Sequence, residues 1–267
     1  MDQHDRPIFI FTHGRSGSTW LQKVLCLHPN IVIWGEHHGF LGPIANAWQR
    51  FAREEARMGL VEAGVSDAPQ MVAPLADLKL KTAWVCPFAS KDVEAGLRTF
   101  ILSMFTAGVP SSVRWGFKEI RYGSRNMADM LVAMFPGSRF LFLTRDLDEC
   151  VRSMVLSWVQ DGWRTRPRAE VASYIDERLL SISKQRSAFE PFVADEPDRC
   201  KLLRYEDLID DFDNVIRSVF AFLEEDLSVV DAERLASAQE TKTWPTAEDP
   251  ELVALVRERR EALDGTC

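Results

Sequence analysis

A short segment rich in glycine and hydroxyl side chains, THGRSGSTW, follows the first apolar run of the chain. Glycine lets the backbone turn tightly and approach an anion, and the free N–H groups at the start of a helix point toward it. Ser16, Ser18 and Thr19 add hydroxyl donors, and Arg15 adds a positive charge. The segment predicts a phosphate-binding loop; the alternative is a simple tight turn between a strand and a helix.

This loop departs from the one that binds nucleoside triphosphates. When Gly17 and Thr19 are aligned with the end of GxxxxGK[ST], Ser18 stands at the lysine position and Thr12 at the first glycine. A kinase or ATPase would then lack the charge that neutralises its β- and γ-phosphates. The segment therefore argues against a phosphotransferase, which stays open as the alternative enzyme class.

Apolar periodicity predicts the elements that must position this loop. Strands are expected over 7–13, 31–34, 113–118, 138–144 and 201–205, and the first is an unbroken apolar run typical of a strand covered on both faces. Helices are expected over 17–27, 40–60, 91–107, 124–135, from 146 onward, and over 168–193 and 208–223. This alternation predicts an α/β fold with an open, mostly parallel sheet flanked by helices. Ligands bind such sheets beyond the carboxyl ends of the strands, where the loop lies.

The composition is that of an ordinary globular chain. It has 267 residues, 46% hydrophobic and 27% charged, and a formal net charge of −8, which argues against a surface built for nucleic acid or anionic membranes. The five cysteines form no CxxC pair, and four lie in apolar runs, so we expect buried reduced thiols and no zinc site. No signal peptide or membrane-spanning run is evident, and we expect a cytoplasmic location.

The loop segment GRSGSTWL resembles the 5′-phosphosulfate loop of the sulfotransferases that use 3′-phosphoadenosine 5′-phosphosulfate (PAPS), and the likeness extends from Pro7 to about Pro245. It implies a P-loop-like three-layer sandwich and a single sulfotransferase domain over 1–267. PAPS would be the co-substrate, and no metal would be required. The residues implied to hold the 5′-phosphosulfate are Arg15, Ser16, Gly17, Ser18, Thr19 and Trp20.

A second match supports this resemblance. In the family, an arginine at a strand end and a serine eight residues later hold the 3′-phosphate of the donor. Here Arg145 follows the apolar run SRFLFLT, and Ser153 stands eight residues further on. A guanidinium grips phosphate bidentately and a hydroxyl completes the shell, so the chemistry is sound. The alternative for Arg145 is an ion pair with Asp146 or Asp148.

The resemblance extends to the remaining donor contacts. The family often has another arginine four residues beyond the serine, where this chain has Ser157, so Arg152 is a candidate to complete the phosphate shell. Tyr205 in YEDL is implied to lie beside the nucleotide; its alternative is a half-buried aromatic at a strand end. Ser237 and Lys242 in SAQETKTWP resemble a late loop that closes over the donor.

The segment LHPNIVIWGEHHGF resembles the tyrosylprotein sulfotransferases and their bacterial relatives, in which a glutamate after HPxxxxxG is the general base. Glu36 holds that position, and we expect Trp34 to desolvate it and raise its pKa. His37 and His38 are the rival bases, because a histidine fills this role in the cytosolic branch of the family. A solvated Glu36 without a role is the remaining alternative.

The segment WGFKEIRYG supplies the cation that the reaction needs. Lys118 matches the lysine of the family that reaches the leaving phosphate, and Arg121 is an alternative for the same role. Lys118 could also be an ordinary surface charge beside Glu119.

The expected function is therefore sulfuryl transfer to an acceptor hydroxyl of a small metabolite, glycolipid or carbohydrate. The alternatives are a phosphotransferase and a non-catalytic adenine-nucleotide-binding protein. We expect residues 40–110 to shape the acceptor pocket. Several tryptophans lie in segments expected to rim this pocket and hint at an aromatic or sugar-bearing acceptor: Trp34, Trp48, Trp84 and Trp115.

Overall fold

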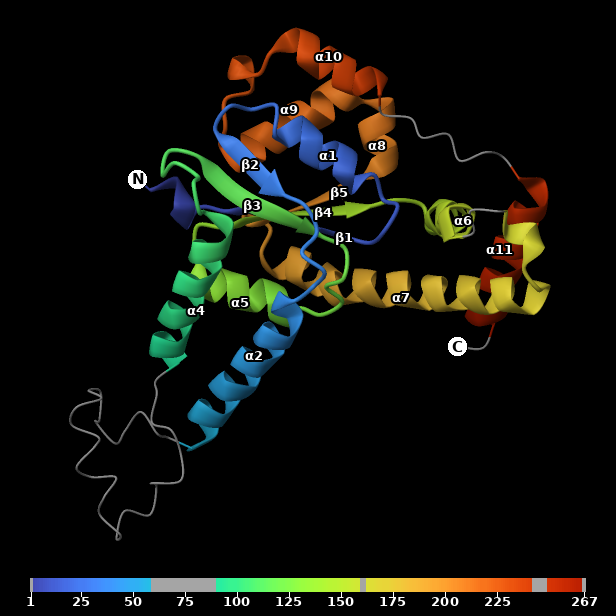
Figure 1. Cartoon of the computed structure of the whole chain (residues 1–267), viewed down its shortest axis with the longest axis horizontal. Coiled ribbons are helices and arrows are strands. Elements are labelled where there is room, and N and C mark those ends of the chain that lie inside the picture. Colours follow the sequence, from blue (N-terminus) through green and yellow to red (C-terminus); the bar gives the residue numbers. More distant parts are fainter. Residues whose placement is uncertain (1, 59–89, 159–161, 242–248, 266–267) are drawn as a thin grey trace.

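The computed structural model (Figure 1) describes residues 2–58, 90–158, 162–241 and 249–265. Its centre is a sheet of five parallel strands in the order β2-β3-β1-β4-β5. The strands are β1 (Ile8–Thr12), β2 (Ile31–Trp34), β3 (Arg114–Glu119), β4 (Arg139–Thr144) and β5 (Cys200–Arg204). The open parallel sheet expected from the sequence is confirmed, and each strand lies within one residue of its expected bounds.

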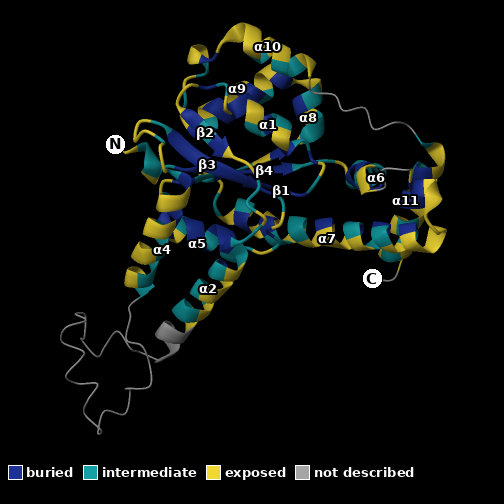
Figure 2. Cartoon of the chain, in the orientation of Figure 1, coloured by how far each residue is buried: buried dark blue, intermediate teal, exposed yellow. Residues whose placement is uncertain are grey.

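The central strand β1 shows why these runs form a sheet covered on both faces. Its side chains alternate: Phe9 and Phe11 pack into one apolar core, and Ile8 and Ile10 pack into the core on the opposite face. All four side chains are buried, and Figure 2 shows the central strands of the sheet as buried. An unbroken apolar run is therefore what this position requires.

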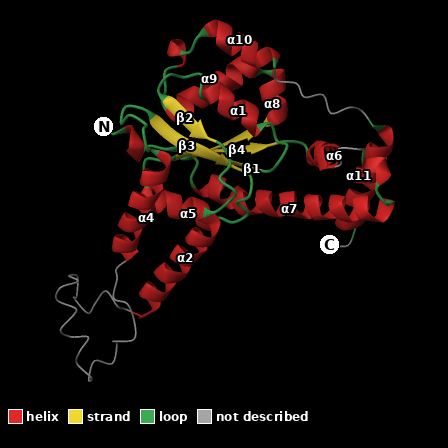
Figure 3. Cartoon of the chain, in the orientation of Figure 1, coloured by secondary structure: helices red, strands yellow, loops and turns green. Residues whose placement is uncertain are grey.

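Helices cover both faces and complete a three-layer sandwich (Figures 1 and 3). On one face lie α1 (Ser18–Leu25), α8 (Tyr205–Asp210), α9 (Phe212–Leu223) and α10 (Ala232–Glu240). On the other lie α2 (Leu41–Met58), α4 (Ser90–Phe105), α5 (Asn126–Met134) and α7 (Arg168–Asp195). The helices α6 (Leu147–Trp158) and α11 (Pro250–Asp264) pack against α7. Short 3₁₀ turns occur at Gln3–Asp5, Trp163–Thr165 and Leu227–Val229.

The structure differs from the expected helices in two places. The single helix expected over 208–223 is broken at Asp211, whose φ of −139° is not helical, and this residue separates α8 from α9. The helices α10 and α11 have no counterpart among the expected elements. Their apolar stripes are short, which explains why periodicity did not reveal them. The segment 61–90, between two expected helices and without a clear apolar period, lies outside the described residues except for Ser90, which begins α4.

The cysteines only partly follow expectation. Cys150 and Cys200 are free and buried, but Cys26 is free and exposed at the end of α1. Cys26 follows the last turn of α1, and its Sγ accepts a hydrogen bond from the Ile33 N–H at 3.3 Å. Cys86 and Cys267 lie outside the described residues.

Candidate active site

The loop between β1 and α1 has the sharp backbone turns that its glycines suggested. Arg15 and Gly17 both adopt left-handed conformations, with φ of 64° and 88°, and Gly17 caps the N-terminus of α1. A Cβ atom at Gly17 would lie 2.4 Å from a ring carbon of Tyr205, so only glycine fits here. The turn thus directs the first N–H groups of α1 and the side chains of Ser18 and Thr19 toward one pocket.

Beneath the turn, hydrogen bonds of hydroxyl groups connect the loop with the sheet. Thr12 Oγ1 lies 2.6 Å from both Ser16 Oγ and the Leu143 carbonyl oxygen. Ser16 is fully buried and its side chain does not line the pocket. The expectation that its hydroxyl donates a hydrogen bond to a bound anion is therefore wrong. Ser16 therefore stabilises the frame of the loop, while Ser18 and Thr19 face the cavity.

The pocket at this loop has a volume of about 800 Å³, within the range of small-molecule sites. It contains four cationic side chains and one carboxylate. Its lining residues are Gly14, Arg15, Gly17, Ser18, Thr19, Trp20, Lys23, Glu36, Lys118, Ile120, Arg145, Ser153, Tyr205 and Thr241. The excess of positive charge in a protein of net negative charge suits an anionic ligand.

Arg145 and Ser153 lie in this same pocket, next to the loop. Arg145 follows β4, and its Nη1 donates a hydrogen bond to the Arg15 carbonyl oxygen at 3.2 Å. Arg15 Nε in turn donates to Ser153 Oγ at 2.8 Å. The Arg145 guanidinium also lies over the Tyr205 ring, 4.6 Å from its centroid. The structure thus brings the two candidate anion-binding groups of the sequence together at adjacent strand ends.

Arg145 does not form the ion pair with Asp146 or Asp148 that the sequence left open. Arg145 contacts Glu149 at 3.5 Å, whereas Asp146 accepts a hydrogen bond from the backbone of Glu149 and Asp148 pairs with Arg260. Arg145 therefore remains available on the pocket side.

Two of the other residues expected to contact the nucleotide, Arg152 and Ser237, are not in the pocket lining. Arg152 pairs with Glu149, and the Ser157 hydroxyl donates to the Ser153 carbonyl oxygen, so neither side chain lines the pocket. Ser237 is exposed on α10, and the neighbouring pocket residue is Thr241, which the sequence had not indicated. Lys242 lies outside the described residues.

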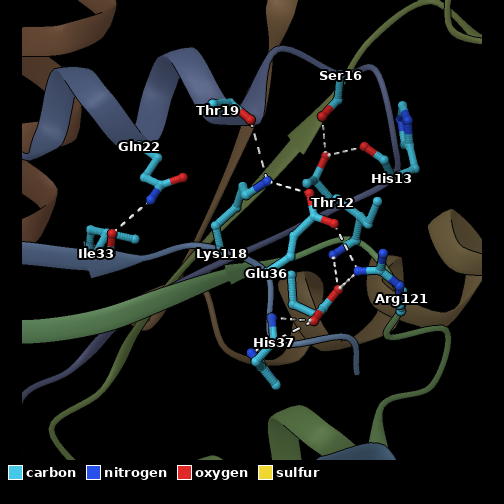
Figure 4. A network of polar contacts seen from close by, with 12 residues as sticks. Thr12, His13, Ser16, Thr19, Gln22, Ile33, Glu36, His37, Lys118 and Arg121 are labelled. Atoms are coloured by element: carbon cyan, nitrogen blue, oxygen red, sulfur yellow. Dashed lines mark hydrogen bonds and ion pairs between the residues drawn. The ribbon is translucent and has the colours of Figure 1, made fainter. Parts of the chain in front are cut away.

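At the end of β3, Glu36 lies between two cations (Figure 4). Lys118 Nζ is 2.6 Å from Glu36 Oε1, and Arg121 Nη1 is 2.8 Å from Glu36 Oε2. Lys118 Nζ also lies 3.4 Å from Thr19 Oγ1, so it connects Glu36 with the loop. Lys118 is only 3% exposed, which excludes the alternative of an ordinary surface charge.

The electrostatics of Glu36 differ from expectation. Partial burial raises its pKa, but the hydrogen bonds and charges of Lys118 and Arg121 outweigh that effect and hold the pKa below its usual range. Trp34 does not desolvate Glu36 in the expected way: it is 42% exposed, and its Nε1 donates to the Phe105 carbonyl oxygen. The expected rise in the pKa of Glu36 is therefore wrong. The sequence did not reveal the two cations as its partners, because they lie more than 80 residues away in the chain.

The two rival histidines do not line the pocket. His37 packs among aromatic rings, including those of Phe117 and Tyr122, and burial lowers its pKa. His38 is exposed and adopts a left-handed conformation with φ of 58°. Of the three candidate bases, only Glu36 faces the loop.

Of the tryptophans expected to rim an acceptor pocket, those in the described residues do not line the pocket at the loop. Trp115 is fully buried in the core, and Trp48 donates to Glu94 on α4. Trp84 lies outside the described residues. No lining residue of the pocket comes from the described parts of 41–110, so the role of this region in acceptor binding remains a prediction.

His13, at the start of the loop, predicts a pH dependence of stability. Burial lowers its pKa from 6.5 to about 4, and the charges of Arg186 and Arg145 add to this effect. Because the unfolded chain binds this proton more readily, stability falls as the pH drops from 6.5 toward 4. We expect His13→Gln to reduce the loss of unfolding free energy between pH 7 and pH 5 by about 2 kcal/mol.

Urea denaturation at the two pH values measures this difference. His38→Gln, a matched change at an exposed histidine, should leave the wild-type loss intact. An equal loss in His13→Gln and wild-type protein would show that His13 does not titrate in this way.

Outside the gaps at 59–89, 159–161 and 242–248, no group of three or more His, Cys, Asp or Glu side chains is arranged to hold a metal ion. The helices of the described residues include none long and apolar enough to cross a membrane.

Comparisons with known proteins agree with this fold. The structure matches that of mouse sulfotransferase SULT7A1 complexed with PAP, with a TM-score of 0.52, 12% identity, and coverage of 99% of this chain and 83% of that one. A sulfotransferase from Alicyclobacillus acidocaldarius matches with a TM-score of 0.48 and 17% identity, and the match covers 97% of this chain and 95% of that one. The sulfotransferase domain from the curacin biosynthetic pathway matches with a TM-score of 0.49 and 18% identity, and the match covers 95% of this chain and 96% of that one.

At 12% identity, the match to SULT7A1 shows a shared fold alone. A comparison with curated protein sequences gave no match. The family model described as the sulfotransferase family, however, matches residues 7–228, which is most of the chain. The chain therefore belongs to the sulfotransferase family.

Proposed function

We propose that this enzyme transfers the sulfuryl group of PAPS to an acceptor hydroxyl, with Glu36 as the general base. The observation that carries the proposal is the single cationic pocket in which the Gly14–Thr19 loop, Arg145 with Ser153, and the Lys118–Glu36 pair meet. A donor with phosphates at two positions needs two anion-binding groups, and this pocket offers both.

The residues fit the chemical parts of PAPS. The N–H groups of the loop, with Ser18 and Thr19, would hold the 5′-phosphosulfate. Arg145 and Ser153 would hold the 3′-phosphate. The ring of Tyr205, which lies against Gly17 and under Arg145, would contact the adenosine. Trp20 lines the same side of the pocket.

In the proposed reaction, the acceptor oxygen forms a bond to sulfur while the bond between sulfur and the bridging phosphate oxygen breaks in line. Glu36 takes the proton of the acceptor hydroxyl. Lys118 and Arg15 stabilise the charge that develops on the departing phosphate. These cations carry out the role that a metal ion has in many phosphoryl-transfer enzymes, so we expect transfer without added metal.

The low pKa of Glu36 fits this scheme because Lys118, which lowers it, can also contact the phosphosulfate of the donor. Lys118 Nζ lies between Glu36 and Thr19 of the loop, so a phosphosulfate held at the loop would compete for it. Loss of part of this ion pair removes a stabilising charge from the carboxylate and raises the pKa of Glu36. We therefore propose that the donor binds first and makes Glu36 a stronger base.

Incubation with radiolabelled PAPS tests the proposed function. The acceptor panel contains phenols, a steroid alcohol, fatty alcohols and simple sugars, covering small metabolites, lipid-like alcohols and carbohydrates. We expect label transfer to at least one class, undiminished by EDTA. Transfer of phosphate from labelled ATP instead would establish the phosphotransferase alternative. Binding of the product 3′-phosphoadenosine 5′-phosphate (PAP) without transfer or PAPS hydrolysis would establish the non-catalytic alternative.

We predict that Arg145→Leu weakens PAP binding about tenfold to a hundredfold, because a hydrogen-bonded charge contributes about 1.5–3 kcal/mol. Adenosine 5′-monophosphate lacks the 3′-phosphate, so its affinity should change by less than about twofold. Isothermal titration calorimetry measures both. Arg204→Leu is the matched control, since Arg204 ends the neighbouring strand β5 but does not line the pocket. Equal weakening of both nucleotides would contradict a 3′-phosphate role for Arg145.

A further inference from the structure

We infer that Glu119, the last residue of β3, is a positioning residue that sets the place and charge of Glu36. This inference rests on the proposed role of Glu36 as the base. Glu119 is 0% exposed and does not line the pocket, so it acts only through other groups. The sequence showed it merely as a charged neighbour of Lys118.

Both oxygens of Glu119 are occupied by donors from the loop that carries Glu36 and from the end of β3. Oε2 accepts hydrogen bonds from the backbone N–H of His37 at 3.2 Å and of Gly39 at 2.8 Å. Oε1 accepts from the backbone N–H of Ile120 at 2.9 Å and from Arg121 Nη1 at 2.8 Å. The same Nη1 lies 2.8 Å from Glu36 Oε2, so Arg121 links the two carboxylates.

The loop is folded around this carboxylate. His38 and Gly39 are consecutive left-handed residues, with φ of 58° and 68°, and this sharp turn lies where the N–H groups of His37 and Gly39 meet one oxygen of Glu119. A Cβ at Gly39 would lie 3.2 Å from Arg121 Cβ, so the loop also packs closely on Arg121. Without the carboxylate, the backbone directly after Glu36 would lose the acceptor that this conformation requires.

Strand geometry explains why Lys118 and Glu119 act on Glu36 from two sides. Successive side chains of a strand point to opposite faces, so Lys118 reaches toward Thr19 of α1 while Glu119 points toward His37 on the other face. Lys118 contacts one oxygen of Glu36 directly. Glu119 acts on the other oxygen through Arg121. The adjacent pair thus fixes both oxygens of the base.

Glu119 remains charged despite its burial. Burial raises its pKa, but the N–H groups of Gly39 and Ile120 and the Arg121 side chain outweigh this and hold the pKa below its usual range. A buried carboxylate is costly unless it is fully hydrogen-bonded, and this one is. Glu119 and Glu36 both contact Arg121, so the negative charge of Glu119 offsets part of the positive charge of Arg121. This limits how far Arg121 lowers the pKa of Glu36.

A double-mutant cycle with Glu119→Gln and Glu36→Gln tests this inference. Hydrolysis of radiolabelled PAPS serves as the readout, because water is the acceptor and no other substrate is needed. We expect Glu119→Gln to lower kcat at least about tenfold when Glu36 is present, with the Kd of PAP changed by less than about twofold. In the Glu36→Gln background, Glu119→Gln should change kcat by less than about twofold.

Two further variants separate positioning from stability. Arg121→Gln removes the link between the carboxylates, so it should also lower kcat, including when Glu119→Gln fails to fold. Unlike Glu119→Gln, it should raise the pKa of Glu36, because a charge that stabilises the carboxylate is lost. Glu225→Gln is the matched control, because Glu225 pairs at 3.0 Å with Arg114 at the other end of β3. It should lower the unfolding free energy and leave kcat unchanged.

The outcomes are distinguishable. Equal losses from Glu119→Gln in both backgrounds would show a general structural effect and overturn the inference. Wild-type kcat in Glu119→Gln or Arg121→Gln, with a large loss in Glu36→Gln, would overturn the inference and leave Glu36 as the base. Wild-type kcat in Glu36→Gln would overturn the role of the base itself, and the positioning role with it.

Discussion

Replacing Glu36 by glutamine is expected to lower kcat for sulfuryl transfer about a hundredfold to ten-thousandfold, the usual contribution of a general base. Glutamine keeps the size of the side chain but cannot accept the proton of the acceptor hydroxyl. Glu36 belongs to neither anion-binding group and competes with the nucleotide for Lys118, so the Kd of PAP should stay within about threefold of the wild-type value or fall. Steady-state kinetics and calorimetry on the same preparation measure both quantities.

His38→Gln is the control for this experiment, since His38 is the exposed rival base. It should retain the wild-type kcat. A normal kcat in Glu36→Gln together with a large loss in His38→Gln would transfer the role of base to the histidine.

Replacing Lys118 by methionine is expected to lower kcat about a hundredfold to a thousandfold, because a preorganised cation at the departing phosphate is lost. The change also removes the hydrogen bond and charge that lower the pKa of Glu36. The pKa of Glu36 should therefore rise, and the acidic limb of the kcat profile should move to higher pH. Kinetics between pH 5 and pH 9 measure both effects.

Lys201→Met, at a lysine of the same sheet in β5, is the matched control and should leave the profile unchanged. An acidic limb that stays in place in Lys118→Met would show that this limb does not report on Glu36. An unchanged kcat would show that Lys118 does not stabilise the departing phosphate.

Much of the fold was predictable because its signals are local. The buried strand β1 is an unbroken apolar run, and Gly17 marks a turn that only glycine can make beside Tyr205. Parallel strands bring their carboxyl ends to one edge, so the loop after β1 and Arg145 after β4 had to lie close together. Their proximity thus follows from the order of the strands.

The charge environment of the base was not predictable in this way. Glu36 meets Lys118 and Arg121 across a gap of more than 80 residues, and only the folded chain places both cations on its carboxylate. Trp34 was therefore given an influence on pKa that it does not have. The same holds for Glu119, whose donors come from a loop that no periodicity describes.

Burial was the other property that sequence did not reveal. Trp115 was expected near an acceptor but packs in the core, and the Ser16 hydroxyl was expected to face the donor but lies beneath the loop. Both lie in segments that contain true pocket residues. Along a strand, a difference of one position decides which face a side chain occupies.

The account as a whole depends on one nucleotide spanning the pocket from the β1 loop to the end of β4. A crystal structure of the PAP complex tests this most directly. We expect the 5′-phosphate at the N–H groups of the Gly14–Thr19 loop and the 3′-phosphate within hydrogen-bond distance of Arg145 and Ser153. A nucleotide whose 3′-phosphate points into solvent, or which occupies another cavity, would contradict the proposed donor site.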